Sequence, residues 1–289
     1  MNGALARLIA EELETPAAPV VVTCAAHFAA HFGPSTAAVL FYGAGLRAPE
    51  PETVLDFYVV TDDLRMLPAV SRLAARILPP NVYAFVVPLE GRMQLCKVAV
   101  LTMRDFTRGM RAFASPLWAR FAQPVSLPYR RDKASTAQVI DALTIAIDTT
   151  ANATLPLMPA SFSSDDLWRR AFAETYAAEL RPESQARANA LVTARYDAIT
   201  AAVLDMPRRR QHPLRARLGW VVRRWWGKLL NALRLMKAAF TYADGLDYAV
   251  AKIARHSGVC VAVTDADRRR PLLGGIRIFL EARRRGGVR

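Results

Sequence analysis

Four short apolar runs lie within the first 101 residues of the chain, and they are rich in Val, Leu, Phe and Tyr. Each run is too short for a buried helix and is bounded by turn residues or by a segment with helical spacing, which is typical of strands that share one sheet. The runs predicted to be strands are residues 37–42, 54–60, 83–88 and 94–101.

Helices are predicted between and before these strands. Apolar residues recur at helical spacing over residues 3–13 and 23–32, ahead of the first strand, and over residues 66–77, between the second strand and the third. The order is helix, helix, strand, strand, helix, strand, strand. Such an order predicts an α+β fold with a mixed sheet.

The chain changes character after Pro124 and Pro128, because the segments that follow have helical spacing and no further strand pattern. We therefore predict a domain boundary near residue 133. In this interpretation residues 1–133 form the sheet domain, and residues 134–289 form an all-helical C-terminal domain.

Composition limits the class of protein further. The chain has 289 residues, 53% of them hydrophobic, which is enough for a full core and an appended helical part. Its three cysteines are far apart and form no C-x-x-C pair, so neither a disulfide framework nor a zinc site is predicted. The N-terminus lacks the apolar core of a secretory signal, and no uncharged apolar run reaches about 18 residues. We expect a cytoplasmic protein, soluble or peripheral on the inner face of the cell membrane.

The net charge of +14 is concentrated in the second half of the chain. Residues 1–133 contain 14 basic and 11 acidic side chains, a net charge of +3, whereas residues 134–289 contain 25 basic and 14 acidic ones, a net charge of +11. A strongly basic half indicates an anionic partner, and the phosphates of lipid bilayers and of nucleic acids are the two common ones.

Residues 206–243 hold ten basic side chains and no acidic one. Within this segment Trp and Leu mix with Arg and Lys at roughly helical spacing, a composition typical of a helix that lies in a membrane interface. The apolar residues expected at the headgroup boundary are Trp220, Trp225, Trp226, Leu229, Leu233 and Met236. The basic residues expected to meet lipid phosphates are Arg223, Arg224, Lys228, Arg234 and Lys237. The alternatives are a helix packed on its own domain and a nucleic-acid interface, and we expect no stable nucleic-acid partner.

A glycine turn, Gly43-Ala44-Gly45, follows the first predicted strand, and Asp56 lies within the second. A turn of small residues lets backbone N–H groups approach a triphosphate, because no side chain blocks the path. An aspartate on the neighbouring strand can hold Mg²⁺ against the same phosphates. The alternative for Asp56 is a strand carboxylate paired with a core arginine.

The segments FYGAGLR, VLDFYVVTDD, PPNVYAF and LCKVAVLT, in this order, resemble those of the mitochondrial-type CTP:phosphatidate cytidylyltransferases, the translocator assembly and maintenance protein family, and their bacterial relatives. That family is a lipid-acting branch of the polymerase-β-like nucleotidyltransferases. The likeness continues through SPLWARFAQPV and LWRRAFAETYAAELRPE, so it covers residues 37 to about 185.

This resemblance implies a polymerase-β-like mixed sheet and a reaction in which phosphatidate attacks CTP, forming CDP-diacylglycerol and pyrophosphate at the membrane surface. It also implies that Gly43, Ala44 and Gly45 form the triphosphate turn, that Asp56 binds Mg²⁺ and that Lys97 neutralises phosphate charge. For Lys97 the alternative is a solvent-facing strand lysine.

Two arginines are candidate ligands for the phosphate of the lipid substrate. Arg120 lies between aromatic residues in a predicted turn, where the alternative is a cap on the domain junction. Arg181 ends a predicted helix, where the alternative is simple complementation of the helix dipole.

The chain departs from the family pattern at two positions. Ala44 stands where the family has Ser, and Tyr58 stands where many nucleotidyltransferases carry a second carboxylate on the same strand face. Asp62 or Asp63 is the candidate replacement from the following loop. The alternative functions are nucleotidyl transfer to another phospholipid or to a sugar phosphate, and binding of anionic lipid by a catalytically inactive relative.

Overall fold

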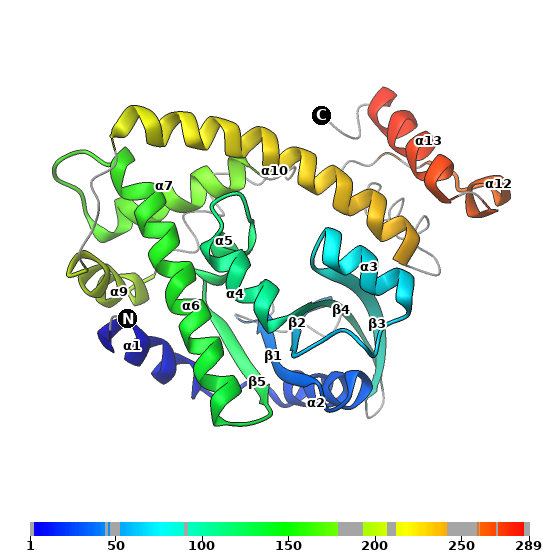
Figure 1. The fold of residues 1–289 in the computed structure, drawn as a ribbon, viewed down its shortest axis with the longest axis horizontal. Coiled ribbons are helices and arrows are strands. Elements are labelled where there is room, and N and C mark those ends of the chain that lie inside the picture. The colour runs from blue at the N-terminus through cyan, green and yellow to red at the C-terminus, as the bar shows by residue number, and fades with distance from the viewer. Residues whose placement is uncertain are drawn as a thin grey trace.

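A five-stranded sheet forms the centre of the computed structural model, and helices pack on both of its faces (Figure 1). The fold is therefore α+β, as predicted, with a mostly helical C-terminal region. The residues that the structure describes are 3–43, 46, 53–89, 92–178, 193–206, 212–241, 259, 261–269 and 271–285.

The strands are arranged in the order β3-β4-β2-β1-β5. β2 runs parallel to β4, whereas the other neighbouring pairs are antiparallel, so the sheet is mixed. The first four strands are the predicted ones, with bounds that differ by at most two residues. The strands are β1 (Thr36–Tyr42), β2 (Leu55–Thr61), β3 (Asn81–Leu89), β4 (Arg92–Thr102) and β5 (Val125–Arg130).

The sequence does not predict β5, because Pro128 lies inside it. Proline cannot donate a backbone hydrogen bond and therefore argues against a central strand. The structure resolves this conflict by placing β5 at the edge of the sheet, where it pairs only with β1. The register of that pairing shifts between Val39 and Phe41, opposite the segment that holds the proline.

Alternation of side chains along the strands divides the core into two layers. Phe57 and Val59 of β2 face a cluster with α2 (Pro19–Phe32) and α3 (Ala69–Ile77). Tyr58 and Val60 face the opposite way. The helices that cover this second face are α1 (Gly3–Leu13), α4 (Met103–Arg111), α5 (Leu117–Phe121) and α6 (Lys133–Thr154).

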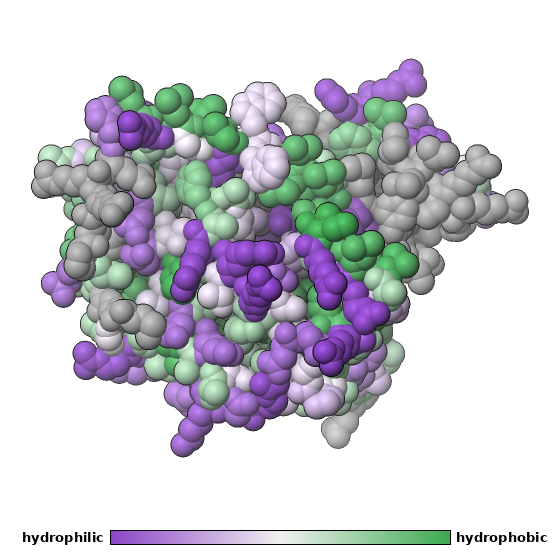
Figure 2. All heavy atoms as spheres, in the orientation of Figure 1, coloured by the Kyte–Doolittle hydropathy of each residue, from purple (hydrophilic) through white to green (hydrophobic). Residues whose placement is uncertain are grey.

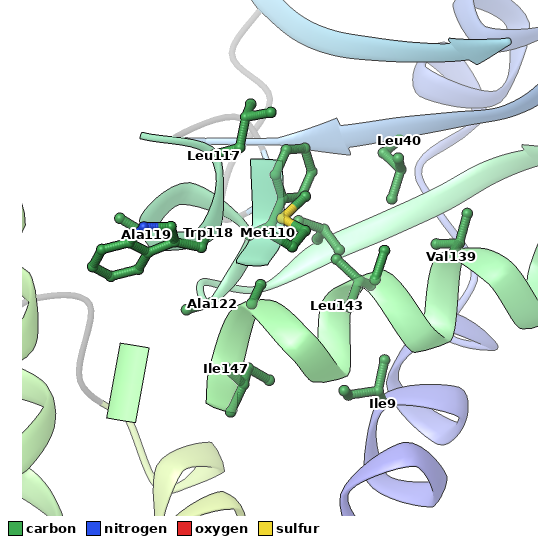
Figure 3. Close-up of a cluster of buried hydrophobic side chains, with 14 of the residues drawn as sticks. Ile9, Leu40, Met110, Leu117, Trp118, Ala119, Ala122, Val139, Leu143 and Ile147 are labelled. Carbon is green, nitrogen blue, oxygen red and sulfur yellow. The ribbon is translucent and has the colours of Figure 1, made fainter. Parts of the chain in front are cut away.

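Helix α6 begins at the predicted domain boundary and packs directly on the sheet. The side chain of Asp132 caps it by accepting a hydrogen bond from the backbone N–H of Ser135 at 2.7 Å. Val139, Leu143 and Ile147 then project from one side of the helix into the cluster that also contains Leu40 of β1 (Figure 3). One hydrophobic cluster therefore joins residues on both sides of position 133.

Of the remaining helices, α7 packs on α6, α9 packs on α1 and α7, and α13, with α12 beside it, packs on α10. The longest, α10, runs along one border of the molecule from the region of α7 to the region of α3 (Figure 1). Within the described residues, no helix is both long enough and apolar enough to cross a membrane. These helices are α7 (Ser164–Ala177), α9 (Arg195–Leu204), α10 (Pro213–Thr241), α12 (Asp265–Arg269) and α13 (Pro271–Arg284).

Candidate functional site

Asp56 and Lys97 lie side by side on two parallel strands. The register of β2 and β4 pairs their Cα atoms, so both side chains leave the same face of the sheet. The distance from Lys97 Nζ to Asp56 Oδ1 is 3.3 Å, and 32% of the Asp56 side chain and 24% of the Lys97 side chain are exposed. The structure thus brings the predicted metal ligand and the predicted phosphate-neutralising lysine together at the end of the sheet where β2 begins, the Asp56 end.

Gly43 adjoins the other oxygen of the same carboxylate. The antiparallel register of β1 and β2 pairs Tyr42 with Asp56, so the residue after β1 arrives next to the aspartate. A Cβ atom on Gly43 would lie 3.6 Å from Asp56 Oδ2, and the φ of +93° disfavours any other residue there. The N–H of Leu46 donates to the carbonyl oxygen of Gly43 at 3.2 Å and closes the turn. Ala44 and Gly45 lie outside the described residues.

Arg120 of α5 reaches the same face of the sheet. Its guanidinium donates a hydrogen bond of 2.7 Å to the hydroxyl of Tyr58, and its Cζ lies 5.5 Å from the centroid of the Tyr42 ring. Tyr58 follows Asp56 by two positions on β2, and the rings of Tyr42 and Tyr58 are 5.1 Å apart. These contacts fix the arginine beside the Asp56–Lys97 pair.

Sequence reasoning treats Tyr58 only as the position of a missing carboxylate and does not consider Tyr42. Both tyrosines share a sheet face with Asp56, and that is the one sequence signal of their place in the site. Their contact with Arg120 depends on the position of α5, which no local pattern encodes.

The side chains at the Asp56 end of the sheet are of the kinds that bind phosphate. Lys97 and Arg120 supply two cationic groups, and the Gly43 turn approaches without a side chain. Within the described residues, no group of three or more His, Cys, Asp or Glu side chains could hold a metal ion. Asp56 offers one carboxylate at this end of the sheet, and Mg²⁺ is an ion that takes one or two carboxylates and completes its shell with substrate phosphates and water.

The predicted replacement carboxylates lie elsewhere. Asp62 follows β2, about 20 Å from Asp56 at about 3.3 Å per strand residue, and it pairs with Arg131. Hydrogen bonds from this arginine to Asp62 and Asp132 raise its pKa. Asp63 accepts a hydrogen bond from the N–H of Arg65. The prediction that Asp62 or Asp63 completes the site is therefore wrong, because the loop leaves the opposite end of the strand.

The alternative interpretation of Asp56, a strand carboxylate paired with a core arginine, does not describe the pair that the structure shows. The partner of Asp56 is the lysine of the neighbouring strand. The second arginine predicted to bind phosphate, Arg181, lies outside the described residues.

Residues 213–241 of the basic segment form α10, but several of its Trp and Arg side chains face the protein and not the surroundings. Trp220 is buried and donates from Nε1 to the carbonyl oxygen of Ala153 at 2.9 Å. Arg223 is also buried, with its Cζ 4.1 Å from the centroid of the Trp118 ring and a hydrogen bond of 3.0 Å to the carbonyl oxygen of Ser115. Neither residue is placed to contact lipid.

Three further basic residues of α10 bind the protein itself. Arg224 forms an ion pair of 2.6 Å with the buried Glu174. Arg234 donates to the carbonyl oxygen of Pro79 at 3.2 Å. Lys237 donates to the carbonyl oxygens of Leu78 and Pro80 just beyond α3, and burial, with Arg234 nearby, lowers its pKa to about 8. Of the five cations predicted to meet lipid phosphates, four thus bind groups of the protein itself, and Lys228 is exposed.

Neither a protein-family model nor a curated protein sequence matches this chain.

Proposed function

We propose that this protein is a Mg²⁺-dependent CTP:phosphatidate cytidylyltransferase of the polymerase-β-like class, acting on the inner face of the cell membrane. The observation that carries the proposal is the meeting of Asp56 and Lys97 beside the Gly43 turn. Three segments that resemble a nucleotidyltransferase in sequence supply these three groups, and their proximity in the sheet supports the proposal.

The proposed reaction needs positioning and charge neutralisation more than covalent help. An oxygen of the phosphatidate phosphate forms a bond to the α-phosphorus of CTP, while the bond from that phosphorus to the bridging oxygen of the pyrophosphate breaks. The attacking oxygen is already anionic, so no proton has to be removed. The products are CDP-diacylglycerol and pyrophosphate.

Each side chain at the Asp56 end of the sheet has a distinct part in this proposal. Lys97 and Arg120 stabilise negative charge that spreads over the phosphate oxygens. The hydroxyl of Tyr58 and the ring of Tyr42 keep Arg120 in place. Mg²⁺, held by Asp56 and by phosphate oxygens of the substrates, would supply further charge neutralisation.

Release of pyrophosphate tests the proposal directly. The full chain is mixed with CTP and Mg²⁺ and with vesicles that contain or lack phosphatidate. We expect release that requires phosphatidate and that falls about 100-fold or more in Asp56→Asn and Lys97→Gln, because each variant removes one charged group from the transition state. The matched control is Asp62→Asn, which alters a carboxylate just beyond the other end of β2, and it should keep the native rate. No release by the native protein, or equal rates for Asp56→Asn and Asp62→Asn, would contradict the proposal.

A second candidate function is binding without catalysis. Two observations favour it: Ala44 lacks the family's serine hydroxyl, and the carboxylate of Asp56 already pairs with Lys97. An inactive relative would bind CTP or anionic vesicles and release no pyrophosphate. Release with a sugar phosphate or with another phospholipid, but not with phosphatidate, would instead assign a different acceptor, and tight binding to RNA with no binding to vesicles would favour a nucleic-acid partner.

A further inference from the structure

We infer that the exposed apolar side of α10, extended by the exposed apolar side of α3, inserts into the interface of an anionic lipid bilayer. The choice of a bilayer as partner rests on the proposed function, but the tests below do not use the reaction. In this arrangement the apolar side chains contact lipid, and most cations of α10 hold the helix on the protein.

Among the side chains of α10 that the structure describes, eight large apolar ones are exposed, and they recur in steps of three or four along the helix. Such spacing gathers them on one side over roughly 30 Å of helix length. Trp225, at the middle of this side, is 75% exposed. The residues that form the α10 lipid face are Leu214, Leu218, Val221, Val222, Trp225, Trp226, Leu229 and Leu233.

The opposite side of the helix is fixed, so the apolar side cannot turn inward. Trp220 and Arg223 are anchored to carbonyl oxygens of other elements. Gly227 packs so closely on the residue after α7 that an added Cβ would lie 2.4 Å from the carbonyl oxygen of Ala178. The exposure of the α10 lipid face is therefore built into the packing.

Helix α3 adds a second apolar stretch at the C-terminal end of α10. Val70, Leu73 and Ile77 are all more than half exposed and are three and four residues apart, so they share one side of α3. The hydrogen bonds from Lys237 and Arg234 to the carbonyl oxygens around Pro79 tie the end of α3 to α10. Figure 2 shows apolar side chains gathered over the region of α3 and again along the border formed by α10.

Charge favours a bilayer over a second copy of the chain. Arg215, Arg217 and Lys228 are exposed on α10, and residues 206–243 contain no acidic side chain that a second copy could pair with them. Two chains of net charge +14 that met along this helix would place like charges together. An anionic bilayer offers an apolar layer for the face and phosphates for these three cations, and tryptophan favours that boundary.

Tryptophan fluorescence of the native protein tests the insertion. Trp118, Trp168 and Trp220 are buried, whereas Trp225 and Trp226 are exposed, so a change in emission on binding reports the last two. With vesicles of phosphatidylglycerol and phosphatidylcholine we expect the protein to float with the lipid and its emission to shift to shorter wavelength. Part of this binding should persist at about 0.5 M salt, because apolar insertion is not screened. Binding with no emission shift and with complete loss in salt would overturn the inference.

A matched pair of leucines locates the surface. Leu229 of the α10 lipid face is 50% exposed, and Leu204 at the end of α9 is 49% exposed. Replacement by glutamine leaves the net charge unchanged in both variants. We expect Leu229→Gln to weaken partitioning into the vesicles about fivefold and Leu204→Gln to leave it unchanged, since burial of apolar area supplies the affinity.

Equal partitioning of the two variants would overturn the inference. Thermal unfolding shows whether both variants keep the native fold, and Ile77→Gln, which alters α3 alone, gives an independent measurement if Leu229→Gln does not fold. Sedimentation without lipid should show a species whose mass does not change with Leu229→Gln. A native dimer that this substitution dissociates would assign the face to a second copy and contradict the lipid assignment.

Discussion

The Asp56 end of the sheet and the helix α10 both carry cations, but the structure uses them in different ways. At the Asp56 end of the sheet Lys97 and Arg120 remain partly exposed. In α10 most cations bind carbonyl oxygens or a buried carboxylate of the same chain, and the apolar residues face outward. Charge composition therefore identifies the kind of partner less well than the direction in which each charged side chain points.

The largest effect on stability is expected where α10 packs against the rest of the protein at Gly227. Gly227→Ala would force a methyl group against a backbone carbonyl at 2.4 Å, whereas Gly219→Ala on the same helix meets its nearest atom at 3.7 Å. We expect the first substitution to lower the free energy of unfolding by about 2–3 kcal/mol through overpacking. The second should leave it unchanged or raise it by up to about 1 kcal/mol, because alanine favours a helix. Urea unfolding of the two variants measures both, and equal values would show that α10 is not held where the structure places it.

For Lys237, which faces the protein, we expect a smaller effect on stability that depends on pH. Lys237→Met leaves carbonyl oxygens around Pro79 without their donor, which should cost about 1–2 kcal/mol of unfolding free energy at neutral pH. Burial lowers the pKa of Lys237 to about 8 from its ordinary 10.5, so between these values the unfolded chain binds more protons than the folded one. Stability contributed through this group should therefore rise as the pH rises from about 8 to 10.5. The difference in melting temperature between native protein and variant should widen over that range, and a constant difference would contradict the assignment.

The smallest effect on stability is expected at the Asp56 end of the sheet. Tyr58→Phe removes the hydroxyl that accepts the hydrogen bond from Arg120 but keeps the ring in the core. We expect about 1 kcal/mol of lost stability and a severalfold slower nucleotidyl transfer, because the guanidinium loses its anchor. Tyr196→Phe is the control, since that buried hydroxyl donates to the carbonyl oxygen of Ala122. It should affect stability and leave the rate per folded molecule unchanged.

Much of the site could be predicted from the strand patterns. Asp56 and Lys97 occupy strands whose apolar alternation is clear, and their pairing then requires only the parallel register of β2 and β4. That register depends on strand order, which is a property of the whole sheet. The place of Arg120 depends in turn on how α5 packs, so its partner Tyr58 could not be named in advance.

The orientation of α10 could not be predicted from composition for a different physical reason. Burial of an arginine is unfavourable unless carbonyl oxygens or aromatic faces receive it. For Arg223 these partners come from Ser115 and Trp118, more than 100 residues earlier in the chain. A pattern of Trp and Arg at helical spacing fits either orientation of the helix, and only the packed core decides between them.

Formation of the lipid product tests the central claim most directly. The native chain and Asp56→Asn are incubated with CTP, Mg²⁺ and phosphatidate vesicles, and the extracted lipid is analysed by mass spectrometry for CDP-diacylglycerol. We predict that the native chain forms this lipid and that Asp56→Asn, although it binds the vesicles equally well, forms about 100-fold less. Absence of the product from the native reaction, or equal amounts from both proteins, would contradict the assignment of the Asp56 end of the sheet as a cytidylyltransferase site.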